Sequence, residues 1–133
     1  VIDGSPRKLI EAELIDQTLG WYEWEKYFHV LLMEVREEEV TSRLLNRRVC
    51  ADCKKIIPYI GELKTLEKCD ACGGNLITRA DDTPEGVKSR IAEYHEHTVP
   101  VIDYYEKQGR IIRINGEQSI EDVHKDILKA LGA

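Results

Sequence analysis

The stretch CADCKKIIPYIGELKTLEKCDAC, residues 50–72, holds all four cysteines of the chain as two Cys-x-x-Cys pairs that enclose 15 residues. Each pair can place two thiolates on one tight turn, and the returning chain can bring the pairs together as a tetrahedron. Segments below roughly 40 residues seldom hold a fold without a metal or disulfides. Bound zinc contributes about 10–16 kcal/mol, whereas one disulfide contributes about 2–4 kcal/mol. The spacing therefore predicts a structural zinc site at Cys50, Cys53, Cys69 and Cys72.

Other states of the four cysteines remain open from the sequence: two disulfides, four free thiols, or iron in place of zinc. A catalytic zinc is disfavoured because four thiolates leave no position for a water molecule. The opening residues Val1-Ile2-Asp3-Gly4 have neither a basic region nor a long apolar stretch, unlike a secretory signal peptide. We therefore expect a reducing, cytoplasmic compartment, in which thiols bind metal rather than form disulfides.

Length and composition restrict the class of protein. With 133 residues, of which 42% are hydrophobic and 33% charged, the chain is sufficient for one modest globular domain. No apolar run approaches the roughly 18 residues of a membrane span. The net charge of −6 argues against broad attraction to nucleic acid or anionic membranes. Within residues 50–72, four lysines face four acidic residues and Tyr59 is the only aromatic, so a nucleic-acid knuckle is also disfavoured.

Around the cysteine segment, hydrophobic periodicity and turn residues predict strands that alternate with helices. The order predicts an α/β fold with a parallel sheet of three strands. The first of these strands, at residues 1–3, resembles a stub that is cut off on its N-terminal side, which suggests that the chain is a piece of something longer. The expected elements are a strand at 1–3, a helix from the Ser5-Pro6 cap to about 19, a strand at 27–35, a helix at 37–48, a helix from Thr83 that Pro100 kinks or breaks and Gly109 ends, a strand at 110–114, and a last helix capped by Ser119 with Asp122.

Arginines and aspartates occur at defined positions on both sides of the cysteine segment. Asp3-Gly4-Ser5-Pro6-Arg7 follows the first strand, and Arg43-x3-Arg47-Arg48-Val49 leads into the first cysteine. After the last cysteine come Arg79-x-Asp81-Asp82 and Arg90. In this order and spacing the chain resembles the C-terminal part of adenylate kinase, of the bacterial type with a zinc-bearing lid. The segments that close the resemblance are Tyr104-Tyr105 and Asn115-Gly116.

The resemblance implies a fold and a reaction. The fold would be part of a P-loop-kinase-type parallel sheet with helices, with residues 1–47 and 83–133 as core and 48–82 as a small zinc-bound lid. The family transfers the γ-phosphoryl group of ATP to AMP, with magnesium, and forms two ADP. Arginine suits this chemistry because its planar fork donates two hydrogen bonds to phosphate oxygens and stays charged.

The resemblance also implies residues that bind the nucleotides. Asp3 would orient magnesium-bound water, and Arg7 would hold the AMP phosphate. Glu11 stands where the family commonly has a glutamine that reads the AMP base. A glutamate has no amide donor, so strict AMP specificity is in doubt. The backbone at Gln118 would receive the adenine amino group of ATP.

The catalytic residues that the resemblance implies are four arginines and one aspartate. Arg43 would lie against the ATP adenine and Arg47 would meet the ATP phosphates. Arg79 and Arg90 would clamp the transferring phosphoryl group from the lid side. Asp81 would be the lid-side acid that partners these arginines.

One expected part is not in these 133 residues, which contain no Gly-x4-Gly-Lys-Ser/Thr phosphate loop. By resemblance, a complete enzyme would have on the order of 80 further N-terminal residues, and we expect the chain alone to be inactive without that P-loop segment. Two other function classes remain: a stand-alone zinc-ribbon interaction protein, and a regulatory nucleotide-binding module without catalysis.

Overall fold

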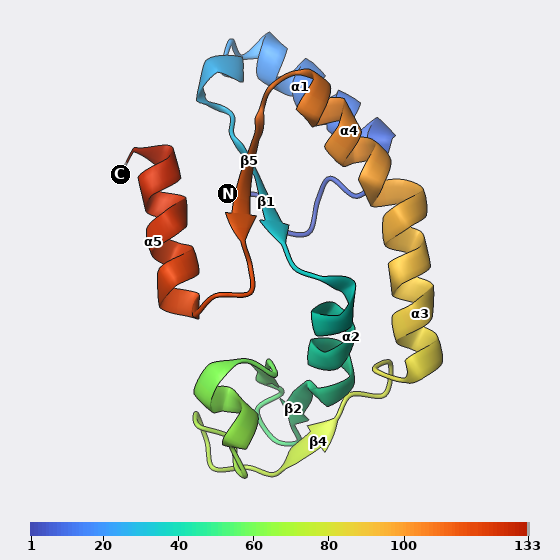
Figure 1. The fold of residues 1–133 in the computed structure, drawn as a ribbon, viewed down its shortest axis with the longest axis vertical. Helices are drawn as coiled ribbons and strands as arrows, with labels where there is room; N and C mark the ends of the chain where they lie inside the picture. Colours follow the sequence, from blue (N-terminus) through green and yellow to red (C-terminus); the bar gives the residue numbers. More distant parts are fainter. Residues whose placement is uncertain (133) are drawn as a thin grey trace.

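The computed structural model describes residues 1–132 (Figure 1). Two regions are visible in it, an α/β core and a small lobe that contains the cysteines. The helices are α1 (Leu9–Trp21), α2 (Glu37–Asn46), α3 (Pro84–Glu93), α4 (Val99–Lys107) and α5 (Ile120–Leu131), with short turns η1 (Glu25–Tyr27), η2 (Gly61–Thr65) and η3 (Tyr94–Thr98). The strands are β1 (Val30–Glu34), β2 (Arg48–Cys50), β3 (Ile56–Ile57), β4 (Leu76–Thr78) and β5 (Ile111–Asn115). None of the helices within residues 1–132 has both the length and the apolar character of a membrane span.

The core is built on a parallel pair of strands. β1 pairs with β5 from Val30↔Ile111 to Glu34↔Asn115. These strands carry apolar residues at successive positions, as in parallel strands that are covered on both faces. Helices α1 and α4 contact each other, and the buried cluster of Ala12, Val101 and Tyr105 joins them to the sheet. Helix α5 packs against β5.

The cysteine lobe, by which we mean residues 48–82, lies at the end of the molecule opposite α1 (Figure 1). Its sheet is antiparallel with the order β3-β2-β4. The lobe is inserted between α2 and α3, which contact each other and form its base. Any movement of the lobe relative to the core must therefore pass through the ends of these two helices.

Two predictions for the N-terminal region are wrong: the strand at 1–3 and the start of the first helix. Residues 1–3 form no strand, and the core sheet has two strands among the described residues rather than three. A strand needs a neighbour for its backbone hydrogen bonds, and β1 and β5 pair only with each other here. Helix α1 begins after Lys8 rather than after Ser5, because the carboxylate of Glu11 accepts hydrogen bonds from the backbone N–H groups of Arg7 and Lys8.

The expected helix starts at Thr83 and Ser119 are confirmed, whereas α1 runs to Trp21 and α2 ends at Asn46 rather than at 48, because Arg48 begins β2. The Thr83 hydroxyl accepts from the backbone N–H of Gly86 at the start of α3, and the Ser119 hydroxyl accepts from Asp122 N at the start of α5. Pro100 lies in the first turn of α4, directly after the wide turn η3. Proline lacks a backbone N–H, and the first turn of a helix is where that donor has no partner in any case.

Candidate functional site

The four cysteines meet at one point of the cysteine lobe. Cys50 ends β2, and the other three lie on the flanking turns. The four sulfur atoms all lie within 4.8 Å of one another. Sγ of Cys50 is 3.5 Å from Sγ of Cys72, and Sγ of Cys53 is 3.6 Å from Sγ of Cys69, so neither pair is a disulfide.

This donor set fits a structural zinc ion. Tetrahedral zinc–thiolate bonds of about 2.3 Å place sulfur atoms roughly 3.8 Å apart. The backbone N–H of Cys53, followed by that of Asp52, lowers the pKa of Cys50 to about 7. The backbone N–H of Gly74 lowers the pKa of Cys72, but the neighbouring thiols Cys50, Cys53 and Cys69 outweigh it and raise that pKa to about 12. A bound cation would favour the thiolate at all four positions. When bound, zinc would supply the cross-link that holds the turns of the lobe together. Four sulfur ligands leave no open position, so the site is structural.

The turn after the last cysteine approaches this site very closely. A Cβ at Gly74 would lie 2.2 Å from Oδ2 of Asp52 and 2.9 Å from Sγ of Cys50. The backbone N–H of Cys69 donates to the Gly74 carbonyl over 2.9 Å. A side chain at position 74 would therefore displace the Asp52 carboxylate and crowd the Cys50 sulfur, a constraint that the cysteine spacing does not reveal.

A buried carboxylate lies where the lobe joins the core. The side chain of Asp82 has no exposed surface, and its two oxygens accept from Nε and Nη2 of Arg47 at 2.8 and 2.7 Å. Nη1 of Arg90 donates to Oδ1 of Asp82 over 3.0 Å. The hydrogen bonds from Arg47 lower the pKa of Asp82, and the charge of Arg90 adds to this effect. Asp82 thus joins the end of α2 to the middle of α3.

Asp81 lies next to these residues and is more exposed than Asp82. We call Arg47, Arg79, Asp81, Asp82 and Arg90 the Asp82 group. Its Oδ2 lies 3.5 Å from Nε of Arg79 and 3.9 Å from Nη2 of Arg90. Four predicted site residues are therefore brought together, namely Arg47, Arg79, Arg90 and Asp81. The sequence analysis gave the partner role to Asp81 alone, whereas the buried partner is Asp82. The doubled aspartate was the available signal, but burial cannot be read from the motif.

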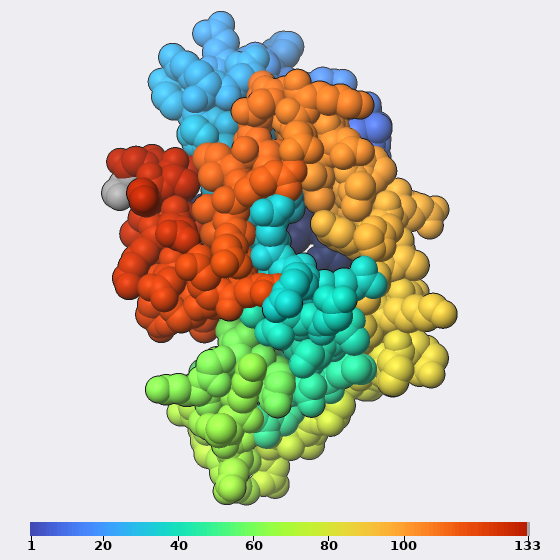
Figure 2. All heavy atoms as spheres, viewed as in Figure 1, coloured from blue at the N-terminus to red at the C-terminus, as the bar shows by residue number. Residues whose placement is uncertain are grey.

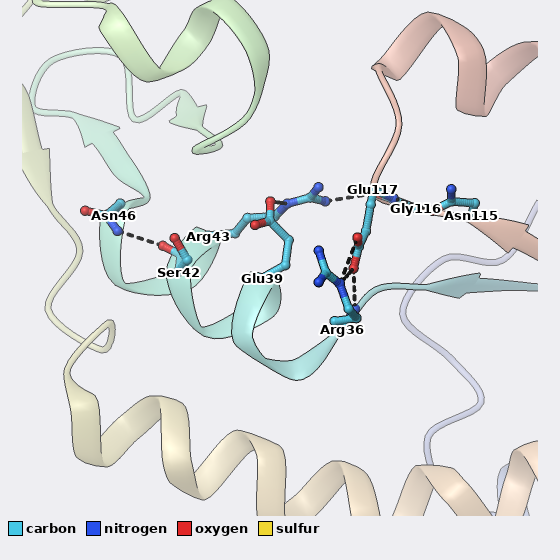
Figure 3. A network of polar contacts seen from close by, with 8 residues as sticks. All are labelled: Arg36, Glu39, Ser42, Arg43, Asn46, Asn115, Gly116 and Glu117. Carbon is cyan, nitrogen blue, oxygen red and sulfur yellow. Dashed lines mark hydrogen bonds and ion pairs between the residues drawn. The ribbon is translucent and has the colours of Figure 1, made fainter.

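Arg43 lies at a second place, where α2 faces the turn that contains Gly116 (Figure 3). Nε of Arg43 donates to Glu39 at 2.7 Å, and its Nη1 donates to the carbonyl of Gly116 at 2.9 Å. The side chain of Gln118 donates to Asp126 at 2.8 Å. The structure therefore places the guanidinium of Arg43 against the turn that precedes Gln118.

The third group of predicted residues is at the N-terminus. Nε of Arg7 donates to the carbonyl of Gly4 at 2.8 Å, and Asp3 is exposed. Oε2 of Glu11 accepts from the backbone N–H of Arg7 at 2.6 Å, which is the main reason that the pKa of Glu11 is lowered. Among residues 1–132, no hydrogen bond or ion pair joins this loop to the Asp82 group. The carboxylate of Glu11 is thus engaged in shaping the loop that carries Arg7.

A cavity of about 820 Å³ lies between β1, α2 and the α3–α4 segment. Figure 2 shows a hollow in the surface between α2 and α4. Most of its lining is apolar, as at Leu32, Val40 and Ile91, with Arg90 and Asn115 among the polar residues. Its chemistry suits a packed polypeptide segment better than a phosphate, so we place the candidate phosphate site at the Asp82 group instead.

Comparison with known proteins identifies the family of the chain. The sequence model of the family described as "Adenylate kinase" matches residues 1–110. The chain is 43% identical over 132 residues to the adenylate kinase of Petrotoga mobilis and 39% identical over 133 residues to that of Caldicellulosiruptor bescii. These matches cover 98–99% of this chain and 61% of each relative, so the chain spans about three fifths of the length of the curated relatives it matches. The clustered cysteines, the arginines at the base of their lobe and these matches together show that the chain belongs to the adenylate kinase family.

Proposed function

We propose that this chain is part of an enzyme that reversibly transfers the γ-phosphoryl group of ATP to AMP, giving two ADP, with magnesium bound to the nucleotide. The observation that carries the proposal is the convergence of Arg47, Arg79 and Arg90 on two adjacent aspartates at the base of the cysteine lobe. Membership of the family supports the reaction class, and the relatives are adenylate kinases, which supports the substrates.

The chemistry of the Asp82 group suits phosphoryl transfer, which needs positioned cations and little covalent help. Three guanidinium groups against two carboxylates leave one positive charge in excess. Asp82 uses Nε and Nη2 of Arg47 and Nη1 of Arg90, so further N–H groups of both arginines point away from it. Asp82 would hold the two arginines in place before a nucleotide arrives, which reduces the cost of ordering them.

The cysteine lobe would act as a lid over this site. Zinc would make the lobe a rigid body, and the Arg47–Asp82–Arg90 contacts lie at the point where that body meets the core. A polyphosphate bound by Arg79 from the lobe and Arg90 from α3 would draw the two sides together. Closure of such a lobe excludes water, which would otherwise accept the phosphoryl group.

The base and monophosphate positions complete the proposal. Arg43 would lie along the adenine of ATP, with the backbone at Gln118 receiving its amino group. Arg7 would bind the phosphate of AMP, and Asp3 would orient water on the magnesium ion. The carboxylate of Glu11 is hydrogen-bonded to the loop that carries Arg7. It would therefore discriminate poorly among the bases of nucleoside monophosphates.

We also propose that an N-terminal P-loop segment works with this chain. Support comes from β1, which has β5 as its one neighbour in the sheet, and from the apolar cavity beside it. A strand and helix packed there would complete the sheet and bring a phosphate cradle near Arg90. A cytoplasmic location is proposed with it, because reduced thiols are needed for a zinc–thiolate site.

A turnover assay tests this function. We expect the 133-residue chain alone to form no ADP at an enzymatic rate, and the protein expressed with its upstream coding sequence to form ADP from ATP and AMP. In the active form, Arg90→Lys should lower kcat/KM by about 100-fold, because a lysine cannot make the two-pronged phosphate contact. Lys125→Gln, at an exposed ion pair on α5, is the matched control and should leave the rate unchanged.

Three outcomes would contradict the proposal. Robust ADP formation by the isolated chain would show that the P-loop segment is not needed. Binding of a two-adenosine polyphosphate without turnover in the longer protein would instead indicate a regulatory nucleotide-binding module, and no binding at all would favour an interaction protein.

A further inference from the structure

The turn after β5 is tied to the start of α2 by an ion pair between residues 81 positions apart. Arg36 precedes α2, and Glu117 follows β5 (Figure 3). Nε of Arg36 lies 2.9 Å from Oε1 and 3.0 Å from Oε2 of Glu117. The backbone N–H of Arg36 also donates to Oε1, over 2.8 Å. One carboxylate thus holds both the side chain and the backbone of the residue at the start of α2.

The exposure of the two side chains and the pKa of Glu117 agree with a persistent contact. The side chain of Glu117 is one-quarter exposed, whereas that of Arg36 is three-quarters exposed. The side-chain hydrogen bond from Arg36, followed by the bond from its backbone N–H, lowers the pKa of Glu117. Most surface ion pairs contribute little, because two long side chains must be ordered for one contact in high dielectric. This pair differs because one of its donors is a backbone N–H that is already fixed by the fold.

Close backbone packing places the same turn against β1. The backbone N–H of Gly116 donates to the carbonyl of Glu34 over 2.8 Å. A Cβ at Gly116 would lie 2.6 Å from Cγ2 of Val35, so a larger residue would push the turn away from the strand. The Gly116 carbonyl then accepts from Nη1 of Arg43. The Arg36–Glu117 pair therefore closes a turn whose next residue, Gln118, is the proposed contact for adenine.

We propose that Glu117 is a positioning residue for the base of ATP. By clamping the 115–118 turn to α2, it would keep the backbone at Gln118 and the guanidinium of Arg43 at a fixed separation before the nucleotide arrives. This inference rests on the proposed function, which assigns the base to that slot. Glu117 itself touches neither base nor phosphate in this scheme, and acts through the turn that it holds.

The test separates the base from the phosphates. In the protein expressed with its upstream coding sequence, calorimetry would measure the Kd of ATP and of inorganic tripolyphosphate, which has no base. We expect Glu117→Gln to weaken ATP by about three- to fivefold and to leave tripolyphosphate unchanged, since only the base uses the 115–118 turn. Arg36→Lys keeps the positive charge and the backbone donor, and should give a smaller loss. Glu106→Gln, which breaks a surface Glu–Arg pair with Arg113 away from the 115–118 turn, is the control and should change neither Kd.

A second measurement does not depend on nucleotide. Hydrogen exchange at the backbone of residues 115–118 should be faster in Glu117→Gln than in wild type, with β1 and α4 unchanged. Unaltered exchange and an unaltered ATP Kd would overturn the inference. Equal weakening of ATP and tripolyphosphate would also overturn it, because a general loss of structure would then be the cause. Wild-type protein that binds neither probe would contradict the proposed function itself, and the inference with it.

Discussion

Asp82 shows how one side chain can organise a site that several arginines share. Its carboxylate has no exposed surface, and three N–H donors from Arg47 and Arg90 satisfy it. A buried charge without such partners would be costly, and two guanidinium groups side by side would repel each other without it. Asp82 is therefore the residue on which the geometry of both arginines depends.

Replacing this carboxylate should destabilise the protein. In Asp82→Asn the negative charge is lost, and the amide N–H₂ group faces the N–H donors of Arg47 and Arg90. We therefore expect the free energy of unfolding to fall by about 3 kcal/mol. Urea denaturation of the zinc-loaded protein measures this. Asp81→Asn removes an acid whose side chain is 63% exposed and should cost much less. Equal losses in the two variants would contradict the assignment of Asp82 as the organising partner.

The same carboxylate gives the sign of a pH dependence. The pKa of Asp82 is lowered from 3.8 in the folded state, so the unfolded chain binds the proton more readily. Its contribution to stability is therefore complete well above pH 3.8 and is lost as the pH falls through the lower, folded pKa. The stability difference between wild type and Asp82→Asn should stay constant from about pH 7 to 5 and shrink below about pH 4.

At the scale of elements, the cysteine lobe contrasts with the helices that carry it. Strands β2, β3 and β4 are two or three residues long, and only Cys50, Ile57 and Cys69 of the lobe's hydrophobic residues are buried. Such a small core cannot offset the entropy of ordering the segment. Helices α2 and α3, in contrast, are each ten residues long and pack against each other, and η3 continues α3 toward α4. The lobe should therefore depend on its metal, whereas the core should not.

Metal removal should thus unfold one region selectively. With a zinc chelator at neutral pH, we expect the backbone amides of residues 48–78 to lose protection from hydrogen exchange, while β1, β5 and α4 keep theirs. Hydrogen-exchange mass spectrometry resolves the two regions in one experiment. Loss of protection throughout the molecule, or in neither region, would show that the lobe and the core are not independent in this way.

At the scale of the whole molecule, the core has one open side. Beside β1, which has a single neighbour in the sheet, lies the apolar cavity of about 820 Å³. The buried cluster of the core contains only Ala12, Val101 and Tyr105. Unpaired strand edges and large apolar patches are sites of association in proteins generally.

The 133-residue chain by itself should accordingly be prone to associate. We expect it to bind a hydrophobic dye and to show a sedimentation coefficient that increases with concentration. The protein expressed with its upstream coding sequence should do neither. A monomeric chain that binds no dye would show that the open side of β1 is covered in some other way.

The starts of α3 and α5 could be predicted from local chemistry. Thr83 and Ser119 are caps because their hydroxyls reach a backbone N–H three residues on, and that geometry is the same in any fold. The start of α1 could not be predicted in this way. The sequence predicts a start at Ser5-Pro6, but the carboxylate of Glu11 accepts from the backbone N–H of Arg7, and the helix begins after Lys8.

By itself, the sequence determined the cysteine quartet, the α/β alternation and the family, because ligand spacing, periodicity and motif order are properties of the chain. Tertiary structure alone decided which aspartate is buried, that β1 lies beside the cavity, and that Arg36 meets Glu117 across 81 positions. Burial and long-range ion pairs depend on how separate segments pack, and no local pattern encodes that packing.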